Sequence, residues 1–149
     1  MTASNASSLV LRLEFGLATV LLASAIGAAQ EEALVAEGVP AGAPVLKVAH
    51  HGSGSSSGSR FLARARPCIA AISCGARNPF GHPAPGTLVR LGEIGAEIHR
   101  TDREGALWYE LPGDGPRRLD WRAPGALASA SHAHAEAPAA RLRAALARP

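Results

Sequence analysis

The sequence predicts an α/β layered fold in which strands and helices alternate between about residues 9 and 111. Short apolar runs typical of strands are separated by segments in which apolar residues recur at helical spacing. The two longest polar loops each follow a strand-like run, and they begin at His50 and Gly75. Because layered α/β folds place their sites at the carboxyl ends of strands, these loops are the first candidates for function.

The first four predicted elements follow from their patterns. Leu9–Phe15 alternates apolar and polar residues, which predicts a half-buried strand, and Thr19–Ala23 predicts a short buried strand that pairs with it as a hairpin. Gln30–Glu37 predicts a helix, since two glutamates stand in its first turn, where the helix dipole favours acids. Val45–Val48 predicts a four-residue strand that leads directly into the first polar loop.

The second half continues the alternation. A proline ends the first helix of this half, and three apolar residues on one side define the second helix. The predicted elements are the helices Arg60–Arg66 and Thr87–Ile94, the strands Cys68–Ser73, Glu97–Arg100 and Ala106–Leu111, and a turn at Thr101–Gly105.

The formal net charge of +3 is unevenly distributed. Residues 1–111 carry nine basic and nine acidic side chains, so the excess comes from residues 112–149, with six basic and three acidic. This carboxyl-terminal range is rich in Ala, Pro and Gly and lacks periodicity, which predicts a disordered tail with Ala139–Ala147 as a marginal helix. A basic tail is compatible with contact to phosphate or anionic lipid, or with simple solvation.

The two cysteines, Cys68 and Cys74, are six positions apart in a predicted strand. Six strand residues span roughly 20 Å, whereas a disulfide requires Cα atoms within about 7 Å. The pair is therefore expected to remain reduced, with both side chains acting as small core residues.

The apolar run Phe15–Ala29 has two interpretations. Its fifteen residues fit the hydrophobic region of a secretory signal, with the small residues Ala23–Ala25 as a cleavage site. The run is shorter than the roughly 20 residues of a membrane span, and Glu14 precedes it where a signal carries positive charge. The alternation that continues from Leu9 favours a strand instead.

His50 and His51 come directly after the strand Val45–Val48, and Gly52 and Ser53 follow them. A strand end holds a ligand rigidly, glycine permits a close approach of the backbone, and exposed N–H and hydroxyl groups suit phosphate or carboxylate. Composition equally allows a flexible Ser/Gly linker that follows two histidines by chance.

His82 lies in a loop stiffened by prolines, where its imidazole is held for metal ligation or, when protonated, for donation to phosphate. His99 is expected to be structural or exposed, and Arg100 with Asp102 resembles a turn-closing pair. His132 and His134 in the tail form only a weak candidate for metal binding.

Several blocks of the sequence resemble, in order and spacing, the metallo-β-lactamase domain of ComEC-type competence proteins. Val45–Ser53 (VLKVAHHGS) resembles the last metal-site motif of that domain, and Asn78 with Gly81-His82-Pro83 resembles a later block. The further matching blocks are Ser8–Leu11, Phe61-Leu62, Ile69–Ser73, Leu88–Leu91, Gly95-Ala96 and Arg100–Asp102.

The resemblance covers residues 5–111 and implies the carboxyl-terminal half of an αββα sandwich whose two halves enclose a dinuclear zinc or manganese site. It implies a metal-dependent hydrolase that acts on the phosphodiesters of DNA during uptake, with two metals clamping the scissile group. The implied metal ligand is His50 or His51, the implied catalytic residue is His82, and Ser53 and Asn78 are the implied substrate-binding residues.

Two departures from the family pattern predict a truncated or degenerate domain that is not catalytic alone. The His-x-Asp-x-Asp-His motif, which supplies most ligands, is absent from this sequence. The family's Leu-Leu-Thr-Gly-Asp appears here as Leu21–Ala25, so a methyl group replaces the bridging carboxylate. The alternatives are an active hydrolase completed by a partner chain and a small exported binding protein.

Partners follow from the same resemblance. They are DNA, a chain that supplies the amino-terminal half of the fold, and other copies of this chain, since an uncovered apolar sheet face favours self-association. The resemblance also implies a membrane-associated or extracytoplasmic location.

Overall fold

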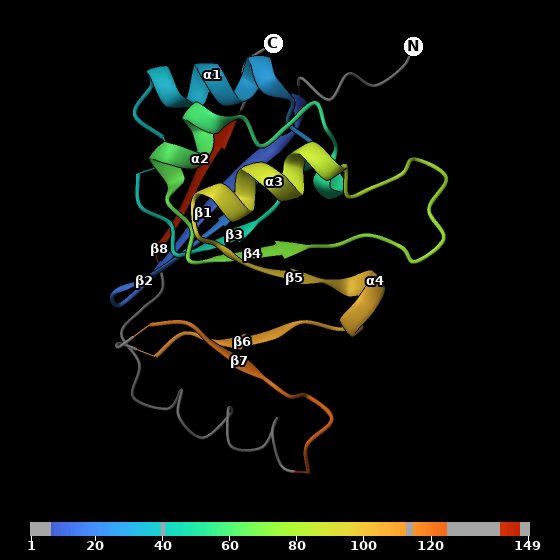
Figure 1. The fold of residues 1–149 in the computed structure, drawn as a ribbon. Helices are drawn as coiled ribbons and strands as arrows, with labels where there is room; N and C mark the ends of the chain where they lie inside the picture. Colours follow the sequence, from blue (N-terminus) through green and yellow to red (C-terminus); the bar gives the residue numbers. More distant parts are fainter. Residues whose placement is uncertain (1–6, 40, 113–114, 125–140, 147–149) are drawn as a thin grey trace.

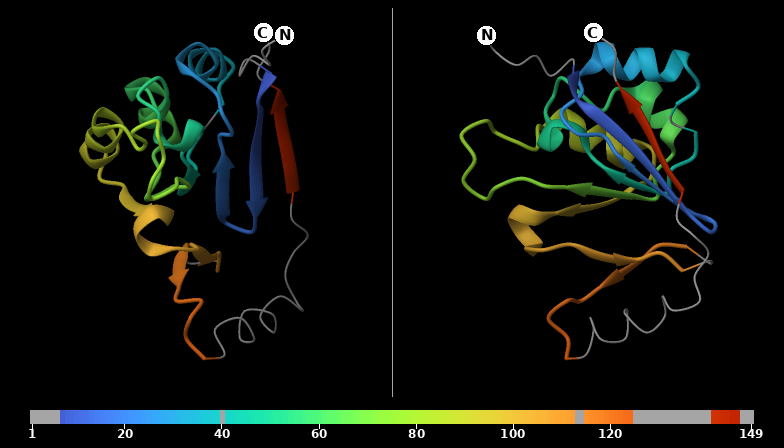
Figure 2. Two further views of the ribbon diagram at one scale, coloured as in Figure 1. Left: turned by 90° about the vertical axis from the view of Figure 1, so that its right-hand side faces the viewer. Right: turned by 180° about the vertical axis from the view of Figure 1, so that it is seen from behind.

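The computed structural model describes residues 7–39, 41–112, 115–124 and 141–146, and within these it shows an α/β arrangement. A mixed sheet has the strand order β5-β4-β3-β2-β1-β8, and β6 and β7 form a separate two-stranded sheet. Figures 1 and 2 show α1, α2 and α3 together on one side of the large sheet.

The elements have these bounds: β1 Leu9–Phe15, β2 Ala18–Leu22, α1 Ala28–Ala36, β3 Val45–Lys47, α2 Ser59–Ala65, β4 Ile69–Ile72, α3 Pro85–Glu93, β5 Glu97–Arg100, α4 Thr101–Glu104, β6 Trp108–Glu110, β7 Arg117–Leu119 and β8 Arg141–Leu146. The strands and helices predicted before residue 100 are confirmed in type, with boundaries shifted by at most two residues at each end. A tight turn at Ala49–Gly52 follows β3.

Beyond residue 100 the structure differs from two predictions, the turn at Thr101–Gly105 and the helix at Ala139–Ala147, and it describes two strands within the range predicted as a tail. The expected turn at Thr101–Gly105 contains the short helix α4. The range assigned to a disordered tail contains β7, which pairs with β6, and β8, which pairs with β1 where a marginal helix was expected. A segment that pairs with an existing strand gains partners for its backbone N–H and C=O groups, and this can occur without any apolar periodicity in the sequence. His132 and His134 lie outside the described residues.

The order of the strands brings four carboxyl ends to one edge. β1 and β2 form the predicted antiparallel hairpin, and β2, β3, β4 and β5 then pair in parallel. Parallel neighbours require crossovers, which α1, α2 and α3 provide. The segments that leave β2, β3, β4 and β5 therefore meet at the same edge, and both histidine-bearing loops are among them.

The hydrophobic core lies between the sheet and the helices. Leu21, Leu46 and Ile72 point from the strands into this layer and are fully buried. The helices contribute Leu34, Phe61, Leu62 and Leu91 to the same cluster. Because side chains alternate along a strand, the intervening residues of β2, β3 and β4 face the other side of the sheet.

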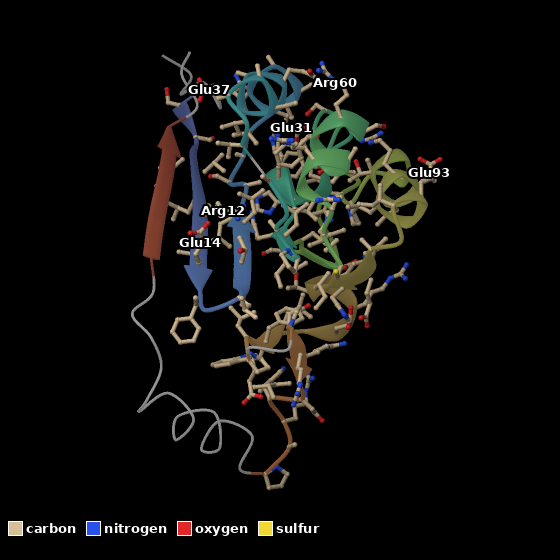
Figure 3. The ribbon with its side chains drawn as sticks, turned by 90° about the vertical axis from the view of Figure 1, so that its left-hand side faces the viewer. Arg12, Glu14, Glu31, Glu37, Arg60 and Glu93 are labelled. Atoms are coloured by element: carbon tan, nitrogen blue, oxygen red, sulfur yellow. The ribbon has the colours of Figure 1, made fainter. Side chains whose placement is uncertain are left out.

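Glu31 is a carboxylate buried within this helical layer, with 2% of its surface exposed. Its two oxygens accept hydrogen bonds from the N–H groups of Ser57 at 2.6 Å and Gly58 at 2.8 Å. Burial raises the pKa of Glu31, and the two N–H donors oppose that rise. Figure 3 shows Glu31 between α1 and α2, away from the outer helical surface where Arg60 and Glu93 lie. The side chain thus ties α1 to the loop before α2.

The cysteine prediction is half correct. Cys68 and Cys74 are both free. Cys68 is exposed and Cys74 is partly buried, so the expectation that both are core residues is wrong. Cys68 precedes β4, where the chain has not yet entered the sheet.

The apolar run Phe15–Ala29 is placed within the folded domain, where it contains β2 and the start of α1. Leu21, Ala23 and Ile26 from this run are completely buried. Within the described residues, no helix has the length and apolar character needed to cross a membrane.

Replacing Glu31 with Gln is expected to lower the free energy of unfolding by about 1–3 kcal/mol. The amide keeps one acceptor oxygen, but its NH₂ group then meets a backbone N–H that loses its partner. Urea denaturation followed by circular dichroism measures the change. Glu32→Gln is the matched control, because Glu32 is exposed and pairs with the surface residue Arg60. Equal destabilisation by both substitutions would contradict a specific role for Glu31.

Candidate functional site

The candidate site lies at the edge where the parallel strands end. The N–H of His50, just after β3, donates to the carbonyl of Ser24, just after β2, at 2.8 Å. The segment after β4 approaches from the other side, because His51 contacts Ser73. Residues 24, 50–51 and 73, which are far apart in sequence, therefore lie together at this edge.

His50 and His51 both adopt the left-handed backbone conformation, with φ angles of 48° and 55°. This conformation is uncommon for residues other than glycine and costs of order 1–3 kcal/mol at each position. Strained residues of this kind concentrate at functional sites. The strain turns the chain sharply as it leaves β3 and points the two imidazoles in different directions.

The ring of His51 is oriented by the backbone. Its Nδ1 donates a hydrogen bond to the carbonyl oxygen of Ser73 at 2.6 Å, which assigns the proton to Nδ1. In the neutral ring the lone pair is then on Nε2. Histidines that bind metals in proteins use this arrangement, in which a carbonyl fixes the tautomer and the ring orientation. The exposed position of His51 leaves Nε2 accessible.

His50 faces the second histidine loop instead. Its ring centroid lies 6.1 Å from that of His82 in an edge-to-face arrangement. His82 also stacks on Phe80, with centroids 5.9 Å apart and planes at 24°. The Nδ1 atom of His82 is buried without a hydrogen-bond partner. The structure therefore brings the sequence-predicted residues His50 and His82 together, and His51 stands apart from this pair.

The two histidine loops are packed directly against one another at Gly52. The carbonyl of Gly52 accepts a hydrogen bond from the N–H of Ala84 at 2.8 Å. A Cβ atom at position 52 would lie only 2.6 Å from Cβ of Pro83, and the φ of Gly52 is +82°. Both the close approach and the left-handed backbone require glycine here.

The serine-rich segment that follows is held in place rather than free, which excludes the flexible-linker interpretation. The buried hydroxyl of Thr87 donates to the carbonyl of Ser53 at 2.9 Å. Arg90 donates from Nε to the carbonyl of Ser57 at 2.8 Å and from Nη2 to that of Ser56 at 2.9 Å. Together with Glu31, these side chains fix the segment through its backbone.

Ser53 and Asn78, the predicted substrate-binding residues, both make internal hydrogen bonds. The hydroxyl of Ser53 lies 3.0 Å from that of Ser55, and Ser53 is 9% exposed. The amide of Asn78 donates to the carbonyl of His82 at 2.7 Å and accepts from the N–H of His82 at 2.9 Å. Asn78 thus closes the loop that presents His82.

A cluster of polar residues lies at the end of β5, on the same edge of the sheet. The sequence predicted only its Arg100–Asp102 pair. Arg100 and Asp102 form the predicted pair through two hydrogen bonds, of 3.0 and 2.7 Å. Arg100 is the main cause that lowers the pKa of Asp102 to about 2. Thr101 bonds both backbone groups of Cys74 at 2.8 Å, and this contact left no signal in the sequence. Burial raises the pKa of the Cys74 thiol, which disfavours a nucleophilic thiolate.

His99 is buried and bonded, as expected of a structural residue. Its Nδ1 lies 3.2 Å from Glu104 and 3.2 Å from Arg118 of β7. Its ring meets that of Tyr109 in β6 edge to face, with centroids 5.9 Å apart. His99 therefore joins the large sheet to the β6–β7 sheet.

The described residues do not fit a dinuclear metal centre. His51 offers one oriented nitrogen, and Ala25, which follows Ser24 at this edge, has no coordinating atom. Among the described residues, no group of three or more His, Cys, Asp or Glu side chains is arranged to hold a metal ion. A dinuclear centre needs several protein ligands, so one imidazole is insufficient.

Gly52→Ala is expected to lower the free energy of unfolding by about 2 kcal/mol or more, because the added methyl group strikes Pro83 in a left-handed backbone. Gly54→Ala is the matched control, since a Cβ there meets Ala84 at an ordinary 3.5 Å. Urea denaturation of both variants measures the difference. A loss of less than about 0.5 kcal/mol in Gly52→Ala would show that the loops are not packed as described.

Comparisons with known proteins relate the sequence to competence proteins. No protein-family model matches the chain. It is 35% identical over 105 residues to ComE operon protein 3 of Bacillus subtilis, a match that covers 70% of this chain and 14% of the relative. It is 36% identical over 108 residues to the competence protein ComA of Neisseria gonorrhoeae, covering 72% of this chain and 16% of the relative. The chain thus matches about one seventh of the length of these relatives, and it is distantly related to ComEC-type competence proteins.

Proposed function

We propose that this chain forms the carboxyl-terminal layer of a metallo-β-lactamase-like domain related to ComEC-type competence proteins and does not hydrolyse phosphodiesters by itself. In this proposal the layer is one half of an αββα sandwich. It contributes a single metal-binding histidine, and a separate polypeptide segment contributes the remaining ligands.

The orientation of His51 is the observation that carries the proposal. Its Nδ1 is fixed on the carbonyl of Ser73, so Nε2 is presented as a ligand at the strand edge. Between His50 and His51, which the sequence left undecided, this favours His51. The ring of His50 instead contacts His82. The adjacent Ala25 provides no second ligand, which supports the absence of catalysis by the chain alone.

The remaining site residues receive different roles in this proposal. His82 is assigned the contact with a phosphodiester because its ring lies beside that of His50 at the strand edge. Its Nδ1 is buried, so the contact would use the other ring nitrogen. Asn78 and Ser53 support substrate binding by fixing the shape of the two loops, since their side chains already make internal hydrogen bonds. The proposed substrate class is DNA, from the relation to competence proteins.

Zinc or manganese is the proposed metal, and its binding is the direct test. The Ala25→Asp variant restores a carboxylate beside His51 and is expected to bind zinc at least about tenfold more tightly than the unsubstituted chain. Competition with a chromophoric chelator measures the affinity, and elemental analysis after dialysis measures the content. Neither protein is expected to cleave single-stranded or double-stranded DNA alone.

Two double variants identify the ligand. Adding His51→Ala to Ala25→Asp is expected to abolish the gain in zinc affinity, whereas adding His50→Ala leaves the gain intact. If both double variants keep the gain, His51 is not the ligand. Stoichiometric zinc or manganese in the unsubstituted chain, together with DNA cleavage, would replace this proposal with that of a complete enzyme.

A further inference from the structure

The loop between β4 and α3 carries an exposed aromatic ring next to the candidate site. Phe80 lies in this loop, two residues before His82, and 76% of its surface is exposed. Figure 1 shows the segment from β4 to α3 extending beyond the edge of the sheet. Among the described residues, the other large aromatic residue with an exposed surface is Trp108 of β6, at 44%. Phe80 is therefore the most exposed aromatic ring in the described part of the chain.

The ring of Phe80 continues a series of ring contacts that starts at the end of β3. His50 meets His82 edge to face, and His82 stacks on Phe80 with the two planes at 24°. Because three quarters of Phe80 stays exposed, His82 covers only part of its ring. The remaining surface of the ring is open to a further flat group, since aromatic rings favour offset stacking.

The loop holds Phe80 in place. The side chain of Asn78 donates to the carbonyls of Gly75 and His82 at 2.8 and 2.7 Å, and it accepts from the N–H of His82 at 2.9 Å. Phe80 thus lies within a turn that Asn78 closes, and a ring held in this way loses little freedom on binding. Single exposed apolar residues such as Leu17 are common on protein surfaces and need no partner. Phe80 differs because it is aromatic, held in a closed turn and stacked on a residue of the candidate site.

The charges of the two histidine loops favour an anionic ligand. Neither His50–Ser59 nor Gly75–Gly86 contains an aspartate or glutamate. Arg77 in the second loop is exposed, and no hydrogen bond or ion pair of its guanidinium is found in the ranges that the structure describes. Asp102, at the end of β5, is paired with Arg100. The loops therefore offer positive charge and hydrogen-bond donors beside an open aromatic face, which complements a phosphate joined to a flat ring.

We propose that the exposed face of Phe80 stacks on an unpaired nucleobase whose neighbouring phosphate contacts His82 and Arg77. This inference deepens the proposed function and rests on its assignment of His82 to a phosphodiester. In a nucleic acid strand, one sugar joins each base to its phosphate, so the two groups are bound by side chains that lie close together. Phe80 and His82 meet this requirement, because their rings are in contact.

The base must be unpaired, because the faces of paired bases are covered by their neighbours in a duplex. A base becomes available to a protein ring in a single strand, or after it has left the stack. Phe80 would thus make the site sensitive to the presence of a base, whereas Arg77 and His82 would bind the phosphate of any nucleotide alike.

A spectroscopic test observes the ring of Phe80 itself. The chain has three phenylalanines, so incorporation of fluorophenylalanine gives three ¹⁹F signals. Phe80→Leu removes and thereby assigns one of them. An oligonucleotide of about eight thymidines is expected to shift the Phe80 signal. Phe61, which is buried, is the internal control, and its signal is expected to stay in place.

Affinities separate base stacking from phosphate binding. The probes are the thymidine oligonucleotide and a strand of equal length that has the same phosphates but no bases, both titrated at low salt. The unsubstituted chain is expected to bind the thymidine strand roughly tenfold more tightly than the baseless strand. Phe80→Leu is expected to remove this difference and Phe80→Trp to keep it. Arg77→Ala is expected to weaken both strands by the same factor of about three.

Leu17→Ala is the matched control for the loss of exposed apolar surface. Leu17 is 85% exposed in the turn between β1 and β2, outside the two histidine loops. This variant is expected to bind both strands as the unsubstituted chain does. A duplex of the thymidine strand with its complement is expected to leave the Phe80 signal unshifted.

Three results would overturn the proposal. One is equal affinity of the unsubstituted chain for the two strands, and another is a Phe80 signal that does not respond to the thymidine strand. The third is equal weakening of both strands by Phe80→Leu, which would make Phe80 a support for His82 only. Equal binding of both strands leaves the phosphate contact of the proposed function standing, whereas absence of binding to either strand at about 1 mM removes that contact as well.

Discussion

The buried carboxylate of Glu31 is the interaction on which the candidate site depends. It receives two N–H groups from the segment before α2, and Thr87 and Arg90 of α3 hold carbonyls of the same segment. A chain of serines and glycines has no apolar side chains to pack, so these hydrogen bonds replace a core. The rigidity of the histidine loop follows, because this segment continues directly from Gly52.

The unfavourable backbone conformation at the start of that loop is offset by the packing of the residue that follows. His50 and His51 adopt a backbone conformation that costs free energy, and the chain keeps it because Gly52 is wedged against Pro83. The result is an oriented imidazole at His51 and a histidine pair at His50 and His82. Ala25, which follows β2 at the same edge, has no coordinating atom, so the site offers few ligands.

The sequence by itself determined the alternation of strands and helices up to residue 100, the loops that carry His50, His51 and His82, and the absence of a coordinating side chain at Ala25. These are local properties, which follow from the spacing of apolar residues and from the identity of single residues. Only the tertiary structure decided that β8 joins the sheet, that Ser73 orients His51, and that the serine segment is fixed by Glu31. Each of these depends on residues more than twenty positions apart, whose contacts leave no periodic pattern in the chain.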